Sequence, residues 1–209
     1  SDVYKRQLLR LLAGLEDPAA GAFVLDGRDT LTTLRYESWE EQVAYIPQDP
    51  TIFHASLREN LTFYNPQASD EHLHAVIEKL GLSELLVQLP QGLDTLIGEG
   101  ARGLSGGQAQ RIALARVVLD ERKRIILFDE PTAHLDIETE MELKQAMVEV
   151  MQERLVVFAT HRLHWLDTLD YLLVLEEGKL VEQGMTTQLL ESTTHFATLV
   201  RALCGGEAA

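Results

Sequence analysis

Residues 124–130 read Arg124-Ile125-Ile126-Leu127-Phe128-Asp129-Glu130, an apolar run that ends in two adjacent acids. Such a run predicts a strand that is buried on both faces, as in a parallel sheet. Ligands of open α/β sheets bind outside the carboxyl ends of the strands, where Asp129 and Glu130 would lie. One carboxylate there can hold Mg²⁺ and its neighbour can polarise an attacking water. The alternative, without a functional role, is that the two acids simply begin a surface loop.

A glycine-rich loop precedes this strand and leads directly into a helical pattern that runs to Leu119. It reads Leu104-Ser105-Gly106-Gly107-Gln108. Two glycines permit close approach of the backbone to a ligand, and Ser105 with the amides of a helix N-terminus offers donors to an anion. Taken alone, such a loop more often only caps a helix. The two acids downstream favour the interpretation as a phosphate site.

The remaining sequence alternates strand and helix patterns. Strands are predicted at 21–27, 43–46, 125–128 and 155–159, with a late pair at 171–175 and 179–181. Helices are predicted at 8–15, 105–119 and 137–152, with two short helices at the end of the chain. Between about 56 and 89, apolar residues recur at helical spacing and predict an all-helical insertion: Leu73, Val76, Ile77 and Leu80. The alternation predicts a parallel sheet covered by helices.

Composition limits the classes of function. The chain has 209 residues, which suits one domain, and its 18 basic and 33 acidic side chains give a formal charge of -15. That charge repels nucleic-acid phosphates, and the densest basic run, Arg122-Lys123-Arg124, is predicted to be a solvated loop before a strand. The single cysteine, Cys204, forms no internal disulfide. No apolar run is long enough to span a bilayer, so a membrane link would come through a partner.

Together these motifs resemble the nucleotide-binding domain of ABC transporters over essentially the whole chain. The resemblance implies an α/β fold of the P-loop NTPase (RecA-like) type, a parallel sheet flanked by helices with an all-helical subdomain inserted. Residues 104–108 resemble the ABC signature, and 125–129 the Walker B strand, with Glu130 as the catalytic glutamate. On this basis residues 1–55 and 105–209 would form the ATPase core, and 56–104 the helical signature subdomain.

Three further segments match the family in the expected order. Gln48 resembles the Q-loop glutamine that reaches Mg²⁺ and the attacking water, and residues 133–136 resemble the D-loop, whose Asp136 would cross a dimer interface. His161 resembles the switch histidine that contacts the γ-phosphate. The resemblance thus implies ATP and Mg²⁺ as cofactors. The implied roles are catalysis by Glu130, His161 and Gln48, metal binding by Asp129 and Gln48, and nucleotide binding by Ser105, Gly106, Gly107, Gln108 and Asp136.

Other stretches narrow the resemblance within the family. Residues 53–61 and 95–100 resemble the exporter pattern, and the second is the stretch that touches intracellular helices of the transmembrane domain. Residues 160–165 resemble the half-transporters that export cysteine or glutathione for cytochrome bd assembly. The implied partners are a transmembrane domain and a second ABC ATPase domain, identical or different, with no nucleic acid. The implied location is the cytoplasmic face of the cell membrane.

One family motif has no match in these 209 residues. A phosphate loop has the pattern G-x-x-x-x-G-K-[ST], because its backbone amides wrap the phosphates and its lysine neutralises them. The family would place Lys-Ser-Thr immediately before Leu8, where the chain has Lys5-Arg6-Gln7 with no preceding glycine. We therefore expect an N-terminally truncated domain that lacks its first strands and phosphate loop. We expect this domain to be less stable than one that keeps those strands, because their loss exposes a sheet edge. We also expect it to bind ATP poorly in its own half-site, while residues 104–108 complete the site of a partner.

Two alternatives stay open. A soluble ABC ATPase of DNA repair, chromosome maintenance or translation would share the signature and Walker B, but such proteins usually carry coiled-coil insertions or basic segments that this acidic chain does not show. A degenerate, non-catalytic ABC module would keep the signature for its partner. Intact Glu130 and His161 argue against that second alternative.

Overall fold

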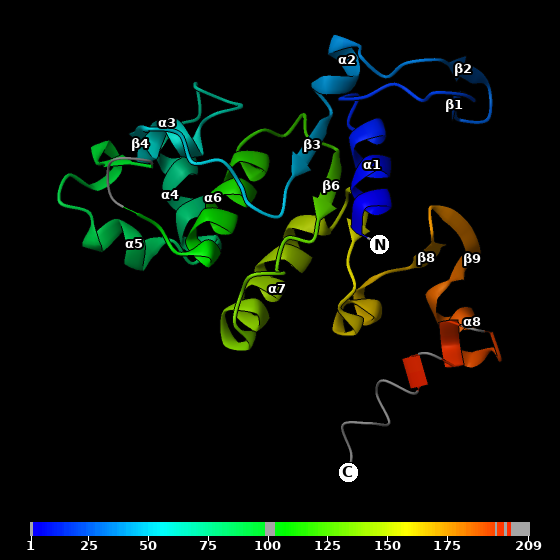
Figure 1. The fold of residues 1–209 in the computed structure, drawn as a ribbon. Helices are drawn as coiled ribbons and strands as arrows, with labels where there is room; N and C mark the ends of the chain where they lie inside the picture. The colour runs from blue at the N-terminus through cyan, green and yellow to red at the C-terminus, as the bar shows by residue number, and fades with distance from the viewer. Residues whose placement is uncertain (1, 99–102, 195, 199, 202–209) are drawn as a thin grey trace. The chain divides into compact units, whose positions relative to one another are not determined.

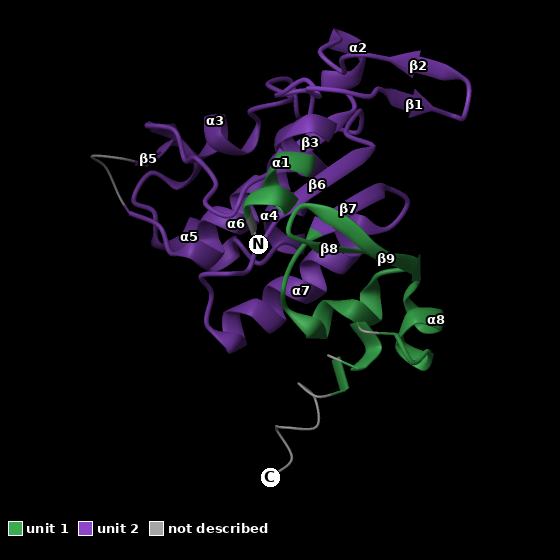
Figure 2. Ribbon diagram, turned by 45° about the vertical axis from the view of Figure 1, so that its right-hand side comes forward, with its two compact units in different colours: residues 1–8, 159–209 green, residues 9–158 purple. Residues whose placement is uncertain are grey.

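The computed structural model describes residues 2–98, 103–194, 196–198 and 200–201. The chain divides into two compact units, one formed by residues 9–158 and the other by residues 1–8 with 159–209 (Figure 2). The larger unit holds both the sheet that carries the predicted acids and the predicted helical insertion. The proposed boundaries 1–55, 56–104 and 105–209 stay a prediction.

The centre of the larger unit is a three-stranded sheet in the order β3-β6-β7 (Figure 1). Its strands are β3 (Val43–Ile46), β6 (Ile125–Asp129) and β7 (Leu155–Ala159). β3 and β6 are parallel, with Ile46 opposite Phe128. The middle of β6 is fully buried, as expected for an aliphatic strand covered on both faces. The three predicted strands are confirmed, two of them at the predicted bounds and β6 one residue longer.

Two long helices accompany this sheet, α6 (Gly106–Val118) and α7 (Ile137–Met151), and α6 packs against both β3 and α7. Each begins at a side chain that accepts a backbone hydrogen bond, Ser105 for α6 and Asp136 for α7. Such caps satisfy amides that have no partner within the helix. Both helices confirm the predictions to within one residue at each end.

The segment after β3 is mostly helical, as predicted. It contains α3 (Leu57–Leu61), α4 (Asp70–Lys79), α5 (Ser83–Gln88) and the 3-10 turn η1 (Gly92–Asp94). The four apolar residues that gave the helical spacing are at most 3% exposed: Leu73, Val76, Ile77 and Leu80. A short antiparallel pair that the sequence pattern did not predict, β4 (Ala55–Ser56) with β5 (Leu96–Ile97), joins the two ends of the segment.

The N-terminal helix differs from its prediction. α1 covers Asp2–Leu12 rather than 8–15, so Lys5 lies inside a helix. Two residues beyond the helix lies Gly14, whose φ of +70° favours glycine and whose added Cβ would lie 2.7 Å from the Leu34 carbonyl oxygen. The Leu15 amide donates to the Arg10 carbonyl and the Gly14 amide to that of Leu11, which is the Schellman pattern.

Between α1 and β3 the chain forms a hairpin and a short helix. β1 (Phe23–Leu25) pairs with β2 (Asp29–Leu31), and α2 (Glu37–Glu40) follows. The strand predicted at 21–27 is therefore confirmed in shorter form, while β2 and α2 were not predicted.

The smaller unit contains η2 (Leu163–Thr168), β8 (Tyr171–Glu176), β9 (Lys179–Met185) and α8 (Thr186–Glu191). β8 and β9 form the predicted strand pair, which is antiparallel, and β9 is longer than predicted. Glu177 and Gly178 join them with positive φ angles of 47° and 78°, as a two-residue hairpin of type I′ requires. Cys204 lies outside the described residues. No helix in the described part of the chain has the length and apolar character needed to cross a membrane.

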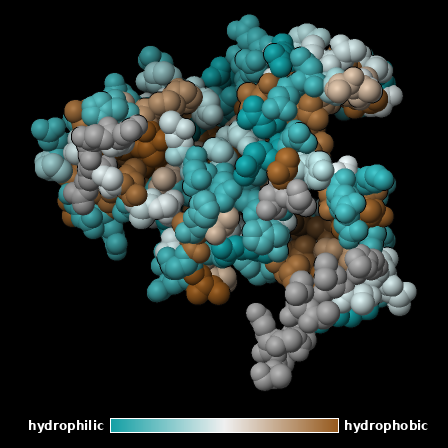
Figure 3. Space-filling model, viewed as in Figure 1, coloured by the Kyte–Doolittle hydropathy of each residue, from teal (hydrophilic) through white to brown (hydrophobic). Residues whose placement is uncertain are grey.

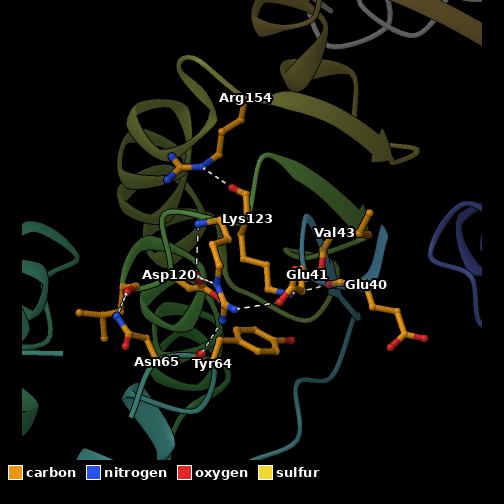
Figure 4. Close-up of polar contacts among 10 residues, drawn as sticks. Glu40, Glu41, Val43, Tyr64, Asn65, Asp120, Lys123 and Arg154 are labelled. Carbon is orange, nitrogen blue, oxygen red and sulfur yellow. Dashed lines mark hydrogen bonds and ion pairs between the residues drawn. The ribbon is translucent and has the colours of Figure 1, made fainter. Parts of the chain in front are cut away.

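The basic run 122–124 is a loop before β6 with Arg122 and Arg124 exposed, as predicted, but its middle residue is buried. Lys123 is only 6% exposed, and its ammonium donates to the carbonyls of Glu40 (2.8 Å) and Val43 (3.1 Å) (Figure 4). The same nitrogen lies 4.5 Å from the centre of the Tyr64 ring. Burial lowers the pKa of Lys123. The prediction fails for Lys123 because the carbonyls at the end of α2 and the start of β3 offer the ammonium the partners that a buried charge requires.

Candidate functional site

The predicted catalytic and metal-binding side chains of the larger unit lie at the carboxyl edge of the sheet. β3 and β6 run in parallel, with Ile46 opposite Phe128. Gln48 lies two residues after Ile46, and Glu130 lies two residues after Phe128. Asp129 is the last residue of β6. The structure therefore brings Gln48, Asp129 and Glu130 to one edge, as the sequence predicted.

Asp129 is held by a residue that the sequence analysis missed. Its carboxylate is buried, with the residue 2% exposed, and accepts a hydrogen bond of 2.9 Å from the Tyr45 hydroxyl. Hydrogen bonds to an ionised acceptor are stronger than neutral ones, so Tyr45 fixes the orientation of the carboxylate. The signal for this contact was the phenol in the otherwise aliphatic strand 43–46, next to the predicted strand of Asp129.

Glu130 begins the turn after β6 in an unusual backbone conformation. Its φ is +49°, in the left-handed region that non-glycine residues seldom adopt, and the residue is 6% exposed. The Ala133 amide donates to the Glu130 carbonyl at 3.1 Å. The buried Thr132 hydroxyl donates to Glu140 of α7 at 2.5 Å. Backbone strain of this kind concentrates at functional sites, where the surrounding contacts maintain it.

The signature loop forms a reciprocal cap on α6. The Ser105 hydroxyl accepts from the Gln108 amide (3.1 Å), and the Ser105 amide donates to Gln108 Oε1 (3.0 Å). The structural alternative for this loop, a helix cap, is therefore present. It does not exclude phosphate binding, because the Ser105 hydroxyl acts here as an acceptor and its own hydrogen can be donated to a ligand.

The two glycines of the signature have different reasons to be glycine. An added Cβ at Gly107 would lie 2.6 Å from Thr139 Cγ2, so Gly107 permits the close packing of α6 on α7. An added Cβ at Gly106 would have Leu135 Cδ2 as its nearest atom, at 3.2 Å, and Gly106 itself is exposed. Gly107 therefore has a packing reason to be glycine within the chain itself, and the nucleotide-binding roles of both glycines stay predictions.

Asp136 is the N-cap of α7. Its carboxylate accepts from the Thr139 amide (3.0 Å) and the Thr139 hydroxyl (2.8 Å), and these two hydrogen bonds lower its pKa, the amide most. Thr139 therefore touches two motifs, through its hydroxyl at Asp136 and through its methyl group near the Gly107 backbone. Asp136 is exposed, and its contact across a dimer interface stays a prediction.

Helix α6 also fixes the Gln48 segment. Gln110 is 3% exposed, and its side-chain nitrogen donates to the Gln48 carbonyl at 2.8 Å. The Gln48 side-chain nitrogen lies 2.8 Å from His134 Nε2, and His134 Nδ1 lies 3.1 Å from Asp49 Oδ1. Gln48, Gly106 and His134 line one cavity of about 100 Å³. The cavity thus joins the Q-loop, signature and D-loop segments.

Another residue of α6, Arg116, holds the segment that follows Gln48 along the chain. Arg116 donates to the Asn60 carbonyl (2.8 Å), to Asn60 Oδ1 (2.9 Å) and to the Thr51 carbonyl (2.9 Å). Its guanidinium lies 5.2 Å and 5.5 Å from the ring centres of Phe53 and Phe63. Burial lowers the pKa of Arg116. Sequence reasoning missed Gln110 and Arg116, and the available signal was a polar residue among the apolar positions of a predicted core helix.

His161 lies two residues after the end of β7 and belongs to the smaller unit, where it is exposed. The neighbouring Thr160 hydroxyl accepts from the Arg162 amide at 3.0 Å. The role of His161 at a γ-phosphate stays a prediction.

The donor set fits Mg²⁺, which prefers oxygen ligands and usually takes only one or two from the protein. The oxygens available are the carboxylate of Asp129, oriented by Tyr45, and the amide oxygen of Gln48. Within the described ranges no group of three or more His, Cys, Asp or Glu side chains forms a metal cluster. The oxygens present therefore suit a metal that completes its shell with water and phosphate.

The chain belongs to the ABC transporter family, whose model matches residues 5–133. It is 45% identical over 204 residues, 98% of the chain, to the glutathione/L-cysteine transport system ATP-binding/permease protein CydC of Bacillus subtilis. It is 36% identical over 95% of its length to the beta-(1→2)glucan export ATP-binding/permease protein NdvA of Brucella melitensis. The solved structure of a bacterial Atm1-family ABC exporter with ATP bound matches 98% of the chain with a TM-score of 0.81 and 32% identity.

These matches confirm the family and the fold class, an α/β ATPase domain of the P-loop NTPase type. The chain spans about a third of the length of the proteins that it matches, 36% of CydC, 33% of NdvA and 35% of the Atm1-family chain. It therefore matches one part of each of these longer proteins.

Proposed function

We propose that this chain is the ATP-binding and ATP-hydrolysing domain of an ABC exporter. The observation that carries the proposal is the meeting of Gln48, Asp129 and Glu130 at one edge of the sheet, with the signature helix α6 hydrogen-bonded to the Gln48 backbone. Three groups of this chemistry can hold a metal and activate a water, and the helix N-terminus beside them suits a phosphate.

The residues would divide the work by their chemistry. Glu130 polarises the attacking water, because it lies in the turn directly after β6. Asp129 and Gln48 hold the metal and its water shell, and His161 donates to the γ-phosphate. Bound Mg²⁺ supplies positive charge that stabilises the phosphate oxygens during transfer.

The signature would act on a second ATPase domain. Ser105, Gly106, Gly107 and Gln108 lie at the N-terminus of α6, and this end favours an anion. Asp136 lies at the N-terminus of α7. Residues 1–209 contain no G-x-x-x-x-G-K-[ST] pattern. We therefore propose that these 209 residues bind ATP weakly alone and complete the site of a partner domain. Micromolar ATP binding with Mg²⁺-dependent hydrolysis by the chain alone would contradict this.

The partner at the membrane would be a transmembrane domain, which places the ATPase at the cytoplasmic face. On the left of the view in Figure 3, apolar side chains lie among hydrophilic ones in the part of the molecule that contains the β4-β5 pair. Phe53 is 40% exposed and Leu96, in β5, is 53% exposed. Apolar groups exposed in one region favour a protein contact. The names of two relatives describe fused ATP-binding/permease proteins, and the similarity to CydC favours cysteine or glutathione as the exported substrate.

The direct test is Glu130→Gln in the full-length protein that contains this chain. The variant should lose ATP turnover while keeping nucleotide-driven dimerisation, because the amide cannot accept a proton but has the same shape. Glu121→Gln, at an exposed position before β6, is the matched control and should keep normal turnover. Full activity of Glu130→Gln would refute the assignment.

The soluble alternative is tested by co-purification. An exporter domain should co-purify with a transmembrane segment, and an ATPase of DNA repair or translation with nucleic acid. The net charge of -15 favours the first outcome.

A further inference from the structure

We propose that His134, with Asp49 behind it, is a positioning residue that sets which end of the Gln48 side-chain amide faces the reaction. The inference deepens the proposed function and rests on it, since it takes Gln48 as the residue that acts on the metal and its water.

The three side chains form a chain of hydrogen bonds with one consistent direction. The Gln48 side-chain nitrogen lies 2.8 Å from His134 Nε2, and an amide nitrogen can only donate. His134 Nε2 therefore accepts, which puts the ring proton on Nδ1. From Nδ1 that proton is donated to Asp49 Oδ1 at 3.1 Å. Asp49 thus selects the tautomer of His134 that can accept from Gln48.

This direction matters because the two ends of an amide have similar size and opposite chemistry. With its nitrogen held by His134, Gln48 presents its oxygen on the other side of the amide. Only the oxygen can bind a cation or accept from a metal-bound water. In the reversed orientation the amide oxygen would face the lone pair of His134 Nε2, and the NH₂ group would face the site.

The rest of the Gln48 residue is already fixed. The side chain of Gln110, which is buried on α6, donates a hydrogen bond of 2.8 Å to the Gln48 carbonyl. The remaining freedom lies in the side-chain torsions, and ordering them before ATP arrives removes an entropic cost from the reaction. His134 lies in the same turn as Glu130, whose carbonyl accepts from the Ala133 amide. One turn therefore carries both the proposed base and the ring that orients Gln48.

A purely structural role for these contacts is separable from the proposed one. The side chains of His134 and Asp49 are 61% and 80% exposed. Exposed polar pairs contribute little to stability. Removal of the ring should therefore leave the melting temperature nearly unchanged while it alters Gln48.

The first test is NMR of the 209-residue chain with ¹⁵N-labelled glutamine, without nucleotide. The Gln48 side-chain NH₂ signals, identified by their loss in Gln48→Glu, should shift and exchange faster with water in His134→Ala. They should stay near their original positions in His134→Asn, whose side-chain oxygen can accept the same bond. His74→Ala, at an exposed histidine on α4, is the control. Unchanged Gln48 signals in His134→Ala would overturn the proposal.

The second test is ATP turnover by the full-length protein. His134→Ala should lower kcat about fivefold to tenfold, the value of one hydrogen bond, with little change in KM for ATP. His134→Asn should recover most of this loss, and Asp49→Ala should have a smaller effect, because the ring can still accept in one of its tautomers. An unchanged kcat in His134→Ala, or an equal loss in His134→Asn, would overturn the proposal. Full activity of Glu130→Gln would instead show that the proposed function itself is wrong.

Discussion

The two ends of the same strand pair, β3 and β6, carry charged and polar groups that are used in different ways. At the amino end, Lys123 and Arg154 donate to main-chain carbonyls of their own fold (Figure 4). At the carboxyl end, Asp129 is oriented by one phenol, and Glu130 sits at a positive φ. The contacts at the amino end join main-chain segments of the fold, while the carboxyl end carries the oxygens of the proposed metal site. A charged side chain at the end of a strand therefore indicates a functional site only when the groups that it contacts are known.

The largest effect should come from the carboxyl end. Asp129→Asn in the full-length protein should lower Mg²⁺-dependent ATP turnover by about a hundredfold or more, because one metal-binding charge is lost. The amide keeps the shape and can still accept from Tyr45, so the melting temperature should change little. Turnover within a few-fold of the original protein would contradict the role given to Asp129.

The matched change at the amino end should affect stability instead. Lys123→Met keeps most of the side-chain stem but leaves the carbonyls of Glu40 and Val43 without their donor. We expect a loss of about 2–3 kcal/mol in the free energy of unfolding, measured by urea denaturation. Turnover per folded molecule should be retained. A variant that is fully stable but inactive would reverse the comparison between the two ends.

The signature glycines allow a finer comparison. Gly107→Ala should destabilise the chain by about 1–3 kcal/mol, because its Cβ would collide with Thr139. Gly106→Ala, with its nearest contact at 3.2 Å, should cost clearly less. Thermal melting of both variants measures the difference. Equal melting temperatures would show that α6 and α7 can separate without loss.

The smallest expected effect concerns the α7 cap. The pKa of Asp136 is lower in the folded chain than its ordinary value of 3.8, since Thr139 donates to the ionised form. Its contribution to stability is therefore present above that ordinary value and is lost as the pH falls through the folded pKa. Asp136→Asn also caps helices well, so it should melt similarly at neutral pH and lose less stability in acid. Identical acid dependence in both proteins would refute this.

Sequence patterns predicted the main elements because these depend on local features. The aliphatic run 125–128 could only be a buried strand next to polar loops, and Ser105 and Asp136 stand where helix caps are expected. The N-terminal helix was misplaced, because its first turns lack a clear apolar pattern. The burial of Lys123 was missed, since its acceptors are 80 and 83 residues away along the chain.

By itself, the sequence determined which family this chain belongs to and which edge of the sheet carries the proposed site, because motif order and strand ends are properties of the linear chain. Only the tertiary structure decided how those residues are held: Tyr45 on Asp129, Gln110 on the Gln48 carbonyl, and His134 on the Gln48 amide. Each of these bonds joins residues more than 60 positions apart. Hydrogen bonds have short range and strict direction, so their partners are set by the packing of distant elements rather than by local pattern.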